Sequence, residues 1–110
     1  MFDNGLSPSA LERLAFLAEE CAEVIQAVGK IVRHGYESSD PTRTESATNR
    51  RMLESELANI RFAISLMTQA GDVSSRNIGA AISARLRNPD RYMHHQGQGD
   101  RSARPRRQRS

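Results

Sequence analysis

The chain has 110 residues and a mass of 12.3 kDa, which is enough for one domain. Hydrophobic residues make up 37% of it and aromatic residues 5%, and there is no tryptophan, so the core has to come from Leu, Ile, Val, Ala and Met, which favours helices over sheets. A domain of this size buries only about 60–65% of its unfolded surface, so we expect partner subunits to complete the core.

Membrane and disulfide-stabilised classes are not supported by the sequence. No apolar run approaches the ~18 residues that a membrane span needs, and no basic-then-apolar leader precedes the first polar residues. We therefore expect a protein that is neither transmembrane nor secreted. The single cysteine, Cys21, excludes a disulfide scaffold and a Cys-rich zinc site, and it favours a reducing cytoplasm.

The net charge of +3 is concentrated near the C-terminal end of the sequence. Residues 97–110 hold five arginines and one acidic residue, Asp100, which leaves 11 basic and 12 acidic residues in positions 1–96. Gly, Ser, Gln and Pro between these arginines predict a disordered tail that contacts nucleic acid only weakly, through phosphates. We therefore divide the chain into one domain over residues 1–96 and a basic tail over residues 97–110.

The first predicted helix opens with a capping box at residues 9–12 (Ser-Ala-Leu-Glu) and runs to about Arg33, with Gly35 as a left-handed stop. At about 100° per residue its apolar side chains fall on one broad side, which we expect to be buried. Cys21 lies on this side and is predicted to be a small buried hydrophobe. The side comprises Leu11, Leu14, Leu17, Ala18, Cys21, Val24, Ile25, Val28 and Val32.

Two further helices complete an all-α prediction. A polar loop over residues 34–48 has no periodicity, and loops of that length tend to be functional lids or disordered. The second helix is predicted over residues 49–70 with Gly71 as its stop, and the third over about residues 75–87, ended by Asn88-Pro89. The expected core residues are Leu53, Leu57, Ile60, Ile64 and Met67 on the second helix, and Ile78, Ala81, Ile82 and Leu86 on the third.

Five polar side chains on the first two helices suggest chemistry. Glu19, Glu20 and Glu23 lie within about one turn and repel one another, so they form either a solvated acidic face or a cation site. Glu56 lies in the middle of the second helix's apolar stripe and Asn59 inside its flank, where a carboxylate is costly unless it is paired or metal-bound. The cost of burying Glu56 would also be removed if an arginine paired with it across an interface, or if its own side chain reached solvent at the end of the helix. The alternative is that the five side chains surround a hard cation, Mg²⁺ or Mn²⁺, and thereby a phosphate-bearing substrate.

This pattern resembles the all-α nucleoside triphosphate pyrophosphohydrolases, the MazG-like superfamily. Their pattern is Glu-Glu-x-x-Glu on one helix and Glu-x-x-Asp on the next, matched here by residues 19–23 (Glu-Glu-Cys-Ala-Glu) and 56–59 (Glu-Leu-Ala-Asn). The similarity covers about residues 9–96, and its further features are those of small phage-encoded MazG-like proteins. These features are residues 29–35 (Gly-Lys-Ile-Val-Arg-His-Gly), 70–73 (Ala-Gly-Asp-Val) and 91–96 (Arg-Tyr-Met-His-His-Gln).

The resemblance implies a helical bundle completed by oligomerisation into dimers or tetramers. It also implies Mg²⁺-dependent hydrolysis of a nucleoside or deoxynucleoside triphosphate to the monophosphate and pyrophosphate, in the cytoplasm (the host's, if the protein is phage-encoded). Carried over by position, Glu20, Glu23 and Glu56 would be metal ligands, and Glu19 would be a further ligand or would orient the attacking water. The implied catalytic set is thus Glu19, Glu20, Glu23 and Glu56, and the implied metal set is Glu20, Glu23, Glu56 and Asn59.

Asn59 departs from the family pattern, which has aspartate at this position. An amide keeps one oxygen for coordination but loses a negative charge and any function as a base. The alternative hypothesis is therefore a catalytically weak or inactive relative that binds nucleotide or metal in a regulatory role. A third hypothesis, a small nucleic-acid-binding protein driven by the tail, is less favoured because residues 1–96 are slightly acidic.

Several cations are candidates for holding substrate phosphates, because the arginine fork matches phosphate oxygens. Each such residue is more often an ordinary surface charge. Tyr36 and Tyr92 are candidates for stacking on a base or for packing. The phosphate-binding candidates are Lys30, Arg33, Arg85 and Arg91, together with Arg87.

Overall fold

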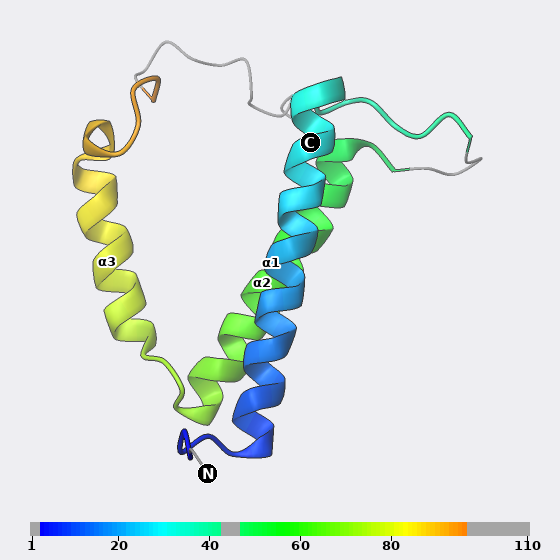
Figure 1. The fold of residues 1–110 in the computed structure, drawn as a ribbon. Helices are drawn as coiled ribbons and strands as arrows, with labels where there is room; N and C mark the ends of the chain where they lie inside the picture. Colours follow the sequence, from blue (N-terminus) through cyan, green and yellow to red (C-terminus); the bar gives the residue numbers. More distant parts are fainter. Residues whose placement is uncertain (1–2, 43–46, 97–110) are drawn as a thin grey trace, which may run out of the picture. The chain divides into compact units, whose positions relative to one another are not determined.

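The computed structural model describes residues 3–42 and 47–96. The regular secondary structure of these residues is helical, with no strand (Figure 1). Three α-helices, α1 (Pro8–His34), α2 (Asn49–Ala70) and α3 (Ser75–Arg87), are followed by the short 3-10 helix η1 (Pro89–Arg91). The all-α prediction and the bounds of the second and third helices are confirmed. The predicted tail, residues 97–110, lies outside the described residues. None of the helices in the described ranges combines the length and the apolar character that a membrane span requires.

The described residues form two compact units, one within residues 1–74 and the other within residues 75–110. The first unit contains α1 and α2, which lie side by side and run in opposite directions (Figure 1). The second contains α3 and η1. All five polar residues of the sequence motif belong to the first unit.

The start of α1 differs from its prediction. The N-cap is Ser7, whose Oγ accepts a hydrogen bond from the backbone N–H of Ala10 at 3.1 Å. Pro8 occupies the first helical turn, where its fixed φ is suitable and its missing N–H would have no intrahelical partner anyway. The capping box predicted at residues 9–12 is therefore wrong, because the helix has already begun before those residues.

Three other helix ends are capped by glycine or threonine. α1 ends at His34, and Gly35 has a positive φ of 87° with an extended ψ of 169°, so it stops the helix without the predicted left-handed helical conformation. At the N-terminus of α2, the side chain of Thr48 accepts a hydrogen bond from the backbone N–H of Arg51 at 3.2 Å. Gly71 ends α2 in the left-handed conformation, as predicted (φ 82°, ψ 11°).

The two long helices pack through a narrow line of mostly small side chains. Ala63 is the most deeply buried of them, with 1% of its surface exposed. Phe16 and Phe62 lie beside this line with their rings edge to face and 5.9 Å between centroids. The buried residues are Ala10 and Ala27 on α1, and Asn49, Ala63 and Met67 on α2.

Most of the predicted apolar side of α1 is exposed in the single chain. Ile25 and Val32 are 72% and 79% exposed, and Cys21 is also exposed, so the predictions of a buried side and a buried thiol are wrong for this chain. The reason is geometric: within the described part of residues 1–74, α2 is the one helix available to cover α1. The other expected core residues that are exposed are Leu11, Leu14, Ala18, Val28, Leu57, Ile82 and Leu86.

The first half of the predicted long loop is anchored to the start of α2. The backbone N–H of Asn49 donates to the carbonyl of Ser38 at 2.7 Å, and that of Arg50 donates to the carbonyl of Tyr36 at 2.8 Å. The Arg50 guanidinium lies 4.3 Å from the centroid of the Tyr36 ring and also bonds Glu37 at 2.8 Å. Tyr36 therefore packs on an arginine, and the loop has a defined path over residues 35–42.

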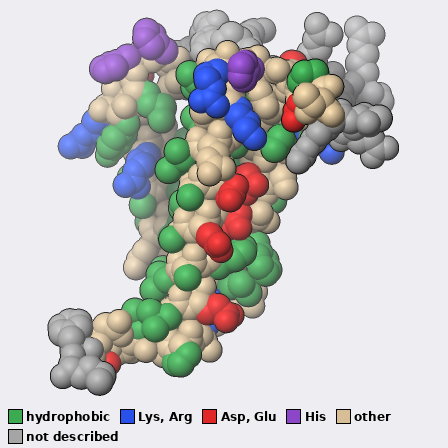
Figure 2. Space-filling model, turned by 45° about the vertical axis from the view of Figure 1, so that its right-hand side comes forward, with side chains coloured by type: hydrophobic (Ala, Val, Ile, Leu, Met, Phe, Trp, Pro, Cys, Tyr) green, Lys and Arg blue, Asp and Glu red, His purple; other side chains and the backbone are tan. Residues whose placement is uncertain are grey.

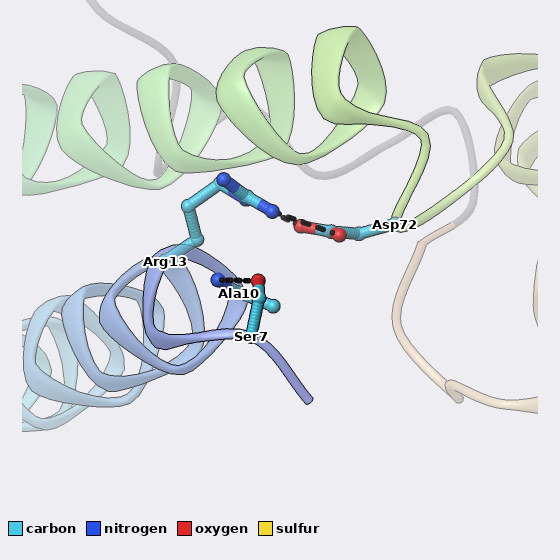
Figure 3. A network of polar contacts seen from close by, with 4 residues as sticks. All are labelled: Ser7, Ala10, Arg13 and Asp72. Atoms are coloured by element: carbon cyan, nitrogen blue, oxygen red, sulfur yellow. Dashed lines mark hydrogen bonds and ion pairs between the residues drawn. The ribbon is translucent and has the colours of Figure 1, made fainter. Parts of the chain in front are cut away.

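At the opposite end of the helix pair, a bidentate ion pair joins α1 to the turn after α2 (Figure 3). Arg13 Nε lies 2.6 Å from Asp72 Oδ2, and its second nitrogen donates to Asp72 Oδ1 at 3.1 Å. The hydrogen bond from Arg13 lowers the pKa of the Asp72 carboxyl below its ordinary value. The two helices are thus held together near both ends.

Candidate functional site

Two acidic side chains and one amide meet midway along the α1–α2 pair. Glu20 on α1 lies opposite Glu56 and Asn59, which are three residues apart and share one face of α2. Asn59 Nδ2 donates a hydrogen bond to Glu20 Oε2 at 2.9 Å. The structure therefore brings Glu20 together with Glu56 and Asn59, which lie far from it in the sequence.

The Glu56 carboxyl group has the least favourable surroundings of the three. Its Oε2 atom is buried, and among the described residues it has no hydrogen-bond partner. Burial is the largest cause of a raised Glu56 pKa, followed by the hydrogen bond and the charge of Glu20 and by the charge of Glu23. A hydrogen bond with Asn59 acts in the opposite direction. An ionised Glu56 thus lies where a cation would relieve both its burial and the repulsion of its neighbours.

The remaining two glutamates of the motif lie at the edge of this cluster. Glu23 and Glu19 are exposed, and Glu23 acts on Glu56 through its charge. In residues 3–42 and 47–96, no group of three or more His, Cys, Asp or Glu side chains is arranged to hold a metal ion. The predicted carboxylates therefore do not converge as a preformed site. Glu23 follows Glu20 by three residues on the same side of α1, so its flexible side chain can turn toward a cation there.

The donor set nevertheless suits a hard cation. Two carboxylates and an amide oxygen are the ligand types that Mg²⁺ and Mn²⁺ prefer, and Mg²⁺ completes its shell with water and substrate phosphates. In the present arrangement, Asn59 turns its Nδ2 toward Glu20. Its amide group would have to turn over to offer oxygen to a metal. A cation at this cluster would therefore be held through Glu20 and Glu56, and the buried Glu56 Oε2 is the oxygen that has no partner among the described residues.

Two of the predicted phosphate-binding residues line a cavity nearer the end of α1. Lys30 and Arg33 form one side of it, residues 38–41 of the loop form another, and the first turn of α2 closes it. Its volume is about 460 Å³. On one face of the helix pair, acidic side chains gather midway along the helices, and Lys, Arg and His side chains gather near one end (Figure 2). The cavity is lined by Lys30, Arg33, His34, Ser38, Ser39, Asp40, Pro41, Asn49 and Met52.

The other three phosphate-binding candidates, Arg85, Arg87 and Arg91, belong to the second unit, and Arg87 is the last residue of α3. Arg85 donates to the carbonyl of Ala81 at 3.2 Å, and its guanidinium lies 5.9 Å from the centroid of the Tyr92 ring. Arg91 lies in η1 and is exposed. A role for Arg85 or Arg91 beside the acidic residues stays a prediction.

The loop side of the cavity was not predictable from the sequence. Ser38 and Asp40 belong to no motif, and no periodicity points to them. The one available signal was Asn49, a polar residue directly after a threonine N-cap, which is buried because it bonds the incoming loop. Met52, one turn later, lines the same cavity.

Comparison with known proteins found no relative of this chain. The resemblance to the MazG-like superfamily therefore depends on the motif residues of the sequence alone. No protein-family model, no curated protein and no solved structure matches the chain.

Proposed function

We propose that this protein is a Mg²⁺-dependent nucleoside triphosphate pyrophosphohydrolase, which cleaves a nucleoside or deoxynucleoside triphosphate to the monophosphate and pyrophosphate. One observation carries the proposal: the buried, unpartnered Oε2 of Glu56 lies beside Glu20 and within the electrostatic reach of Glu23. A divalent cation bound there would give this oxygen the partner that it lacks among the described residues. Mn²⁺ has the same oxygen preference and is expected to substitute for Mg²⁺.

In this proposal, Glu20 and Glu56 hold the cation and Glu23 turns inward as a third ligand. When bound, Mg²⁺ polarises the phosphate oxygens and lowers the pKa of a coordinated water. Asn59 fixes the orientation of Glu20 through its hydrogen bond. Glu19 is exposed one turn before Glu23, where its carboxylate serves as a further ligand or holds the attacking water.

The second candidate is a protein that binds nucleotide or metal with weak or no turnover. The observation that favours it is the hydrogen bond from Asn59 to Glu20. An ionised aspartate at position 59 would repel Glu20 instead, so the amide lets the pair of helices close without metal. Such a protein would act in regulation rather than in hydrolysis.

We also infer that the protein functions as a homo-oligomer, a dimer or a tetramer. The exposed apolar residues of α1 recur at alternating spacings of three and four, the spacing of a coiled-coil seam. A continuous apolar stripe of this length is unusual on the surface of a monomer. The stripe comprises Leu11, Leu14, Ala18, Cys21, Ile25, Val28 and Val32.

Pyrophosphate release from a panel of nucleoside and deoxynucleoside triphosphates, with Mg²⁺ or Mn²⁺, tests the proposal. The wild type is compared with Asn59→Asp, and Glu56→Gln serves as the variant expected to be inactive. Turnover by the wild type that is lost in Glu56→Gln supports the enzyme. A silent wild type with an active Asn59→Asp variant supports the binding protein, and silence in both rejects hydrolysis of the nucleotides tested.

A further inference from the structure

The cavity at the end of α1 carries more positive than negative charge. Lys30 and Arg33 line it, and within the described residues neither of them forms an ion pair. Asp40 is the acidic residue of the cavity, and its Oδ1 accepts hydrogen bonds from the backbone N–H and the hydroxyl of Thr42, at 2.9 and 2.7 Å. The two cations are therefore available to an anionic ligand.

The attraction for an anion comes from side chains and not from the N-terminus of α2. The backbone N–H groups of Asn49 and Arg50 already donate to the carbonyls of loop residues. The Asn49 side chain donates to the carbonyl of Gly35 at 3.1 Å. The groups left to a ligand are the ammonium of Lys30, the guanidinium of Arg33 and neighbouring hydroxyls, which are the groups that bind phosphate oxygens.

The cavity and the acidic cluster follow one another along the same helices. Lys30 lies seven residues after Glu23, almost two full turns, so both are on one side of α1 about 10 Å apart along its axis. Met52 lines the cavity four residues before Glu56, which is about 6 Å along α2. A ligand anchored in the cavity can therefore extend to Glu23 and Glu56, and Glu20 also lies against Glu56.

We propose that this cavity binds the two terminal phosphates of the triphosphate substrate and hence the leaving pyrophosphate. The inference depends on the proposed function for its place in catalysis. With the two terminal phosphates in the cavity, the first phosphate of the triphosphate lies at Glu20 and Glu56. A water oxygen bonds to that phosphorus, the bond from it to the bridging oxygen breaks, and pyrophosphate leaves with the electron pair. The water proton passes to a carboxylate of the acidic cluster.

Direct binding of inorganic pyrophosphate to the full chain, by titration calorimetry in metal-free buffer, tests the cavity without requiring turnover. Lys30→Gln/Arg33→Gln keeps the side-chain stems and removes both cations from the cavity. Arg51→Gln/Arg61→Gln removes the same charge from exposed positions of α2 that do not line it. We expect the cavity variant to bind pyrophosphate roughly tenfold more weakly than the wild type, or weaker still, which is the loss typical of a charge-assisted hydrogen bond. We expect no change in the control variant.

Three outcomes would overturn the assignment: a wild type that binds no pyrophosphate, a cavity variant that binds as well as the wild type, or equal weakening in both double variants. Equal weakening would mean that pyrophosphate responds to net charge alone. Cavity-dependent binding by a protein that hydrolyses no nucleotide would retain the pyrophosphate site while rejecting the proposed function. The two proposals therefore fail separately.

Discussion

Asn59 on α2 donates a hydrogen bond of 2.9 Å to the carboxylate of Glu20 on α1. The contact joins the two halves of the acidic motif across the helix pair, at the position where the family pattern has an aspartate. It replaces a repulsion between two carboxylates by an attraction. Asn59 therefore stabilises the contact between α1 and α2.

Replacing Asn59 by Asp should reverse this balance. We expect the metal-free variant to melt at a lower temperature than the wild type and to gain more from Mg²⁺, because a further charged ligand raises affinity for a hard cation. Thermal melts with and without Mg²⁺ measure both effects. Ser55→Asp, which adds the same charge at an exposed position of α2, is the matched control. Equal responses from the two variants would show that position 59 has no special relation to a cation.

Glu56→Gln should be more stable than the wild type at neutral pH without metal. The pKa of Glu56 is raised in the folded chain, so its ionisation opposes folding. This cost is absent below the unfolded pKa and builds up as pH rises through the folded one. Urea unfolding at acidic and neutral pH in the presence of EDTA measures the difference, with the exposed Glu54→Gln as control. A Glu56→Gln variant less stable than the wild type at neutral pH would contradict the assignment of strain to this carboxylate.

Divalent metal should reverse that order of stability. A ligand at one hundred times its dissociation constant adds about 2.7 kcal/mol to the stability of the state that binds it. We expect Mg²⁺ or Mn²⁺ to stabilise the wild type and to leave Glu56→Gln unchanged. Stabilisation of both proteins to the same extent would place the cation elsewhere in the molecule.

The ion pair at the other end of the helices gives the opposite pH dependence. Because Arg13 lowers the pKa of Asp72, the carboxylate contributes stability at neutral pH, and this contribution is lost as pH falls through the lowered pKa. We expect Asp72→Asn to unfold more easily than the wild type at pH 7 and equally easily in strong acid. Glu54→Gln, at an exposed position of α2 away from Arg13, controls for the loss of charge. A difference that persists in acid would mean that the substitution acts through packing.

Cys21 offers a test of the oligomer. It lies near the midpoint of the exposed stripe, which runs from Leu11 to Val32. In a two-fold pair of α1 helices, whether parallel or antiparallel, the midpoint of the stripe meets its own copy. Mild oxidation should therefore produce a disulfide-linked dimer on non-reducing gels. Cys21→Ala/Gln26→Cys moves the thiol off the stripe and should not cross-link, and a monomeric mass by light scattering for the wild type would reject the oligomer.

The line of close helix contact can be tested by overpacking. Ala63 is 1% exposed, whereas Ala58 on the same helix is exposed. Ala63→Leu should destabilise the chain by about 1–3 kcal/mol, because the added methylenes force the helices apart. Ala58→Leu should change stability little. Chemical denaturation of both variants measures the contrast, and similar losses would show that helix separation is not limiting.

The helices of this protein were predictable because each end carries a local signal. Gly71 and Pro89 stop helices for steric reasons that need no partner, and the predicted bounds of α2 and α3 are confirmed. Ser9 failed as a cap because Ser7 and Pro8 supply an equally local signal two residues earlier. The predicted start of α1 was therefore wrong by two residues because two neighbouring serines were both possible N-caps.

The burial of individual side chains was less predictable. Periodicity placed Ile25 on the buried side of α1 and did not select Ala27, but α2 covers Ala27 and leaves Ile25 exposed. Glu56 could be recognised as unusual because it interrupts an apolar stripe. Its orphaned oxygen and the contact of Asn59 with Glu20 depend on the rotation of two helices about their axes, which no single-helix pattern contains.

The contacts at the two ends of the helix pair also bear on how a cation would enter the proposed site. The ion pair of Arg13 with Asp72 joins the helices at one end, and the bonds of the loop to Asn49 and Arg50 join them at the other, so separation of the helices between these contacts is opposed from both ends. A cation bound at Glu56 would therefore enter from the side, through motions of glutamate side chains on the nanosecond scale rather than through refolding. Association should be fast, and the helical circular dichroism should be the same before and after the ion binds.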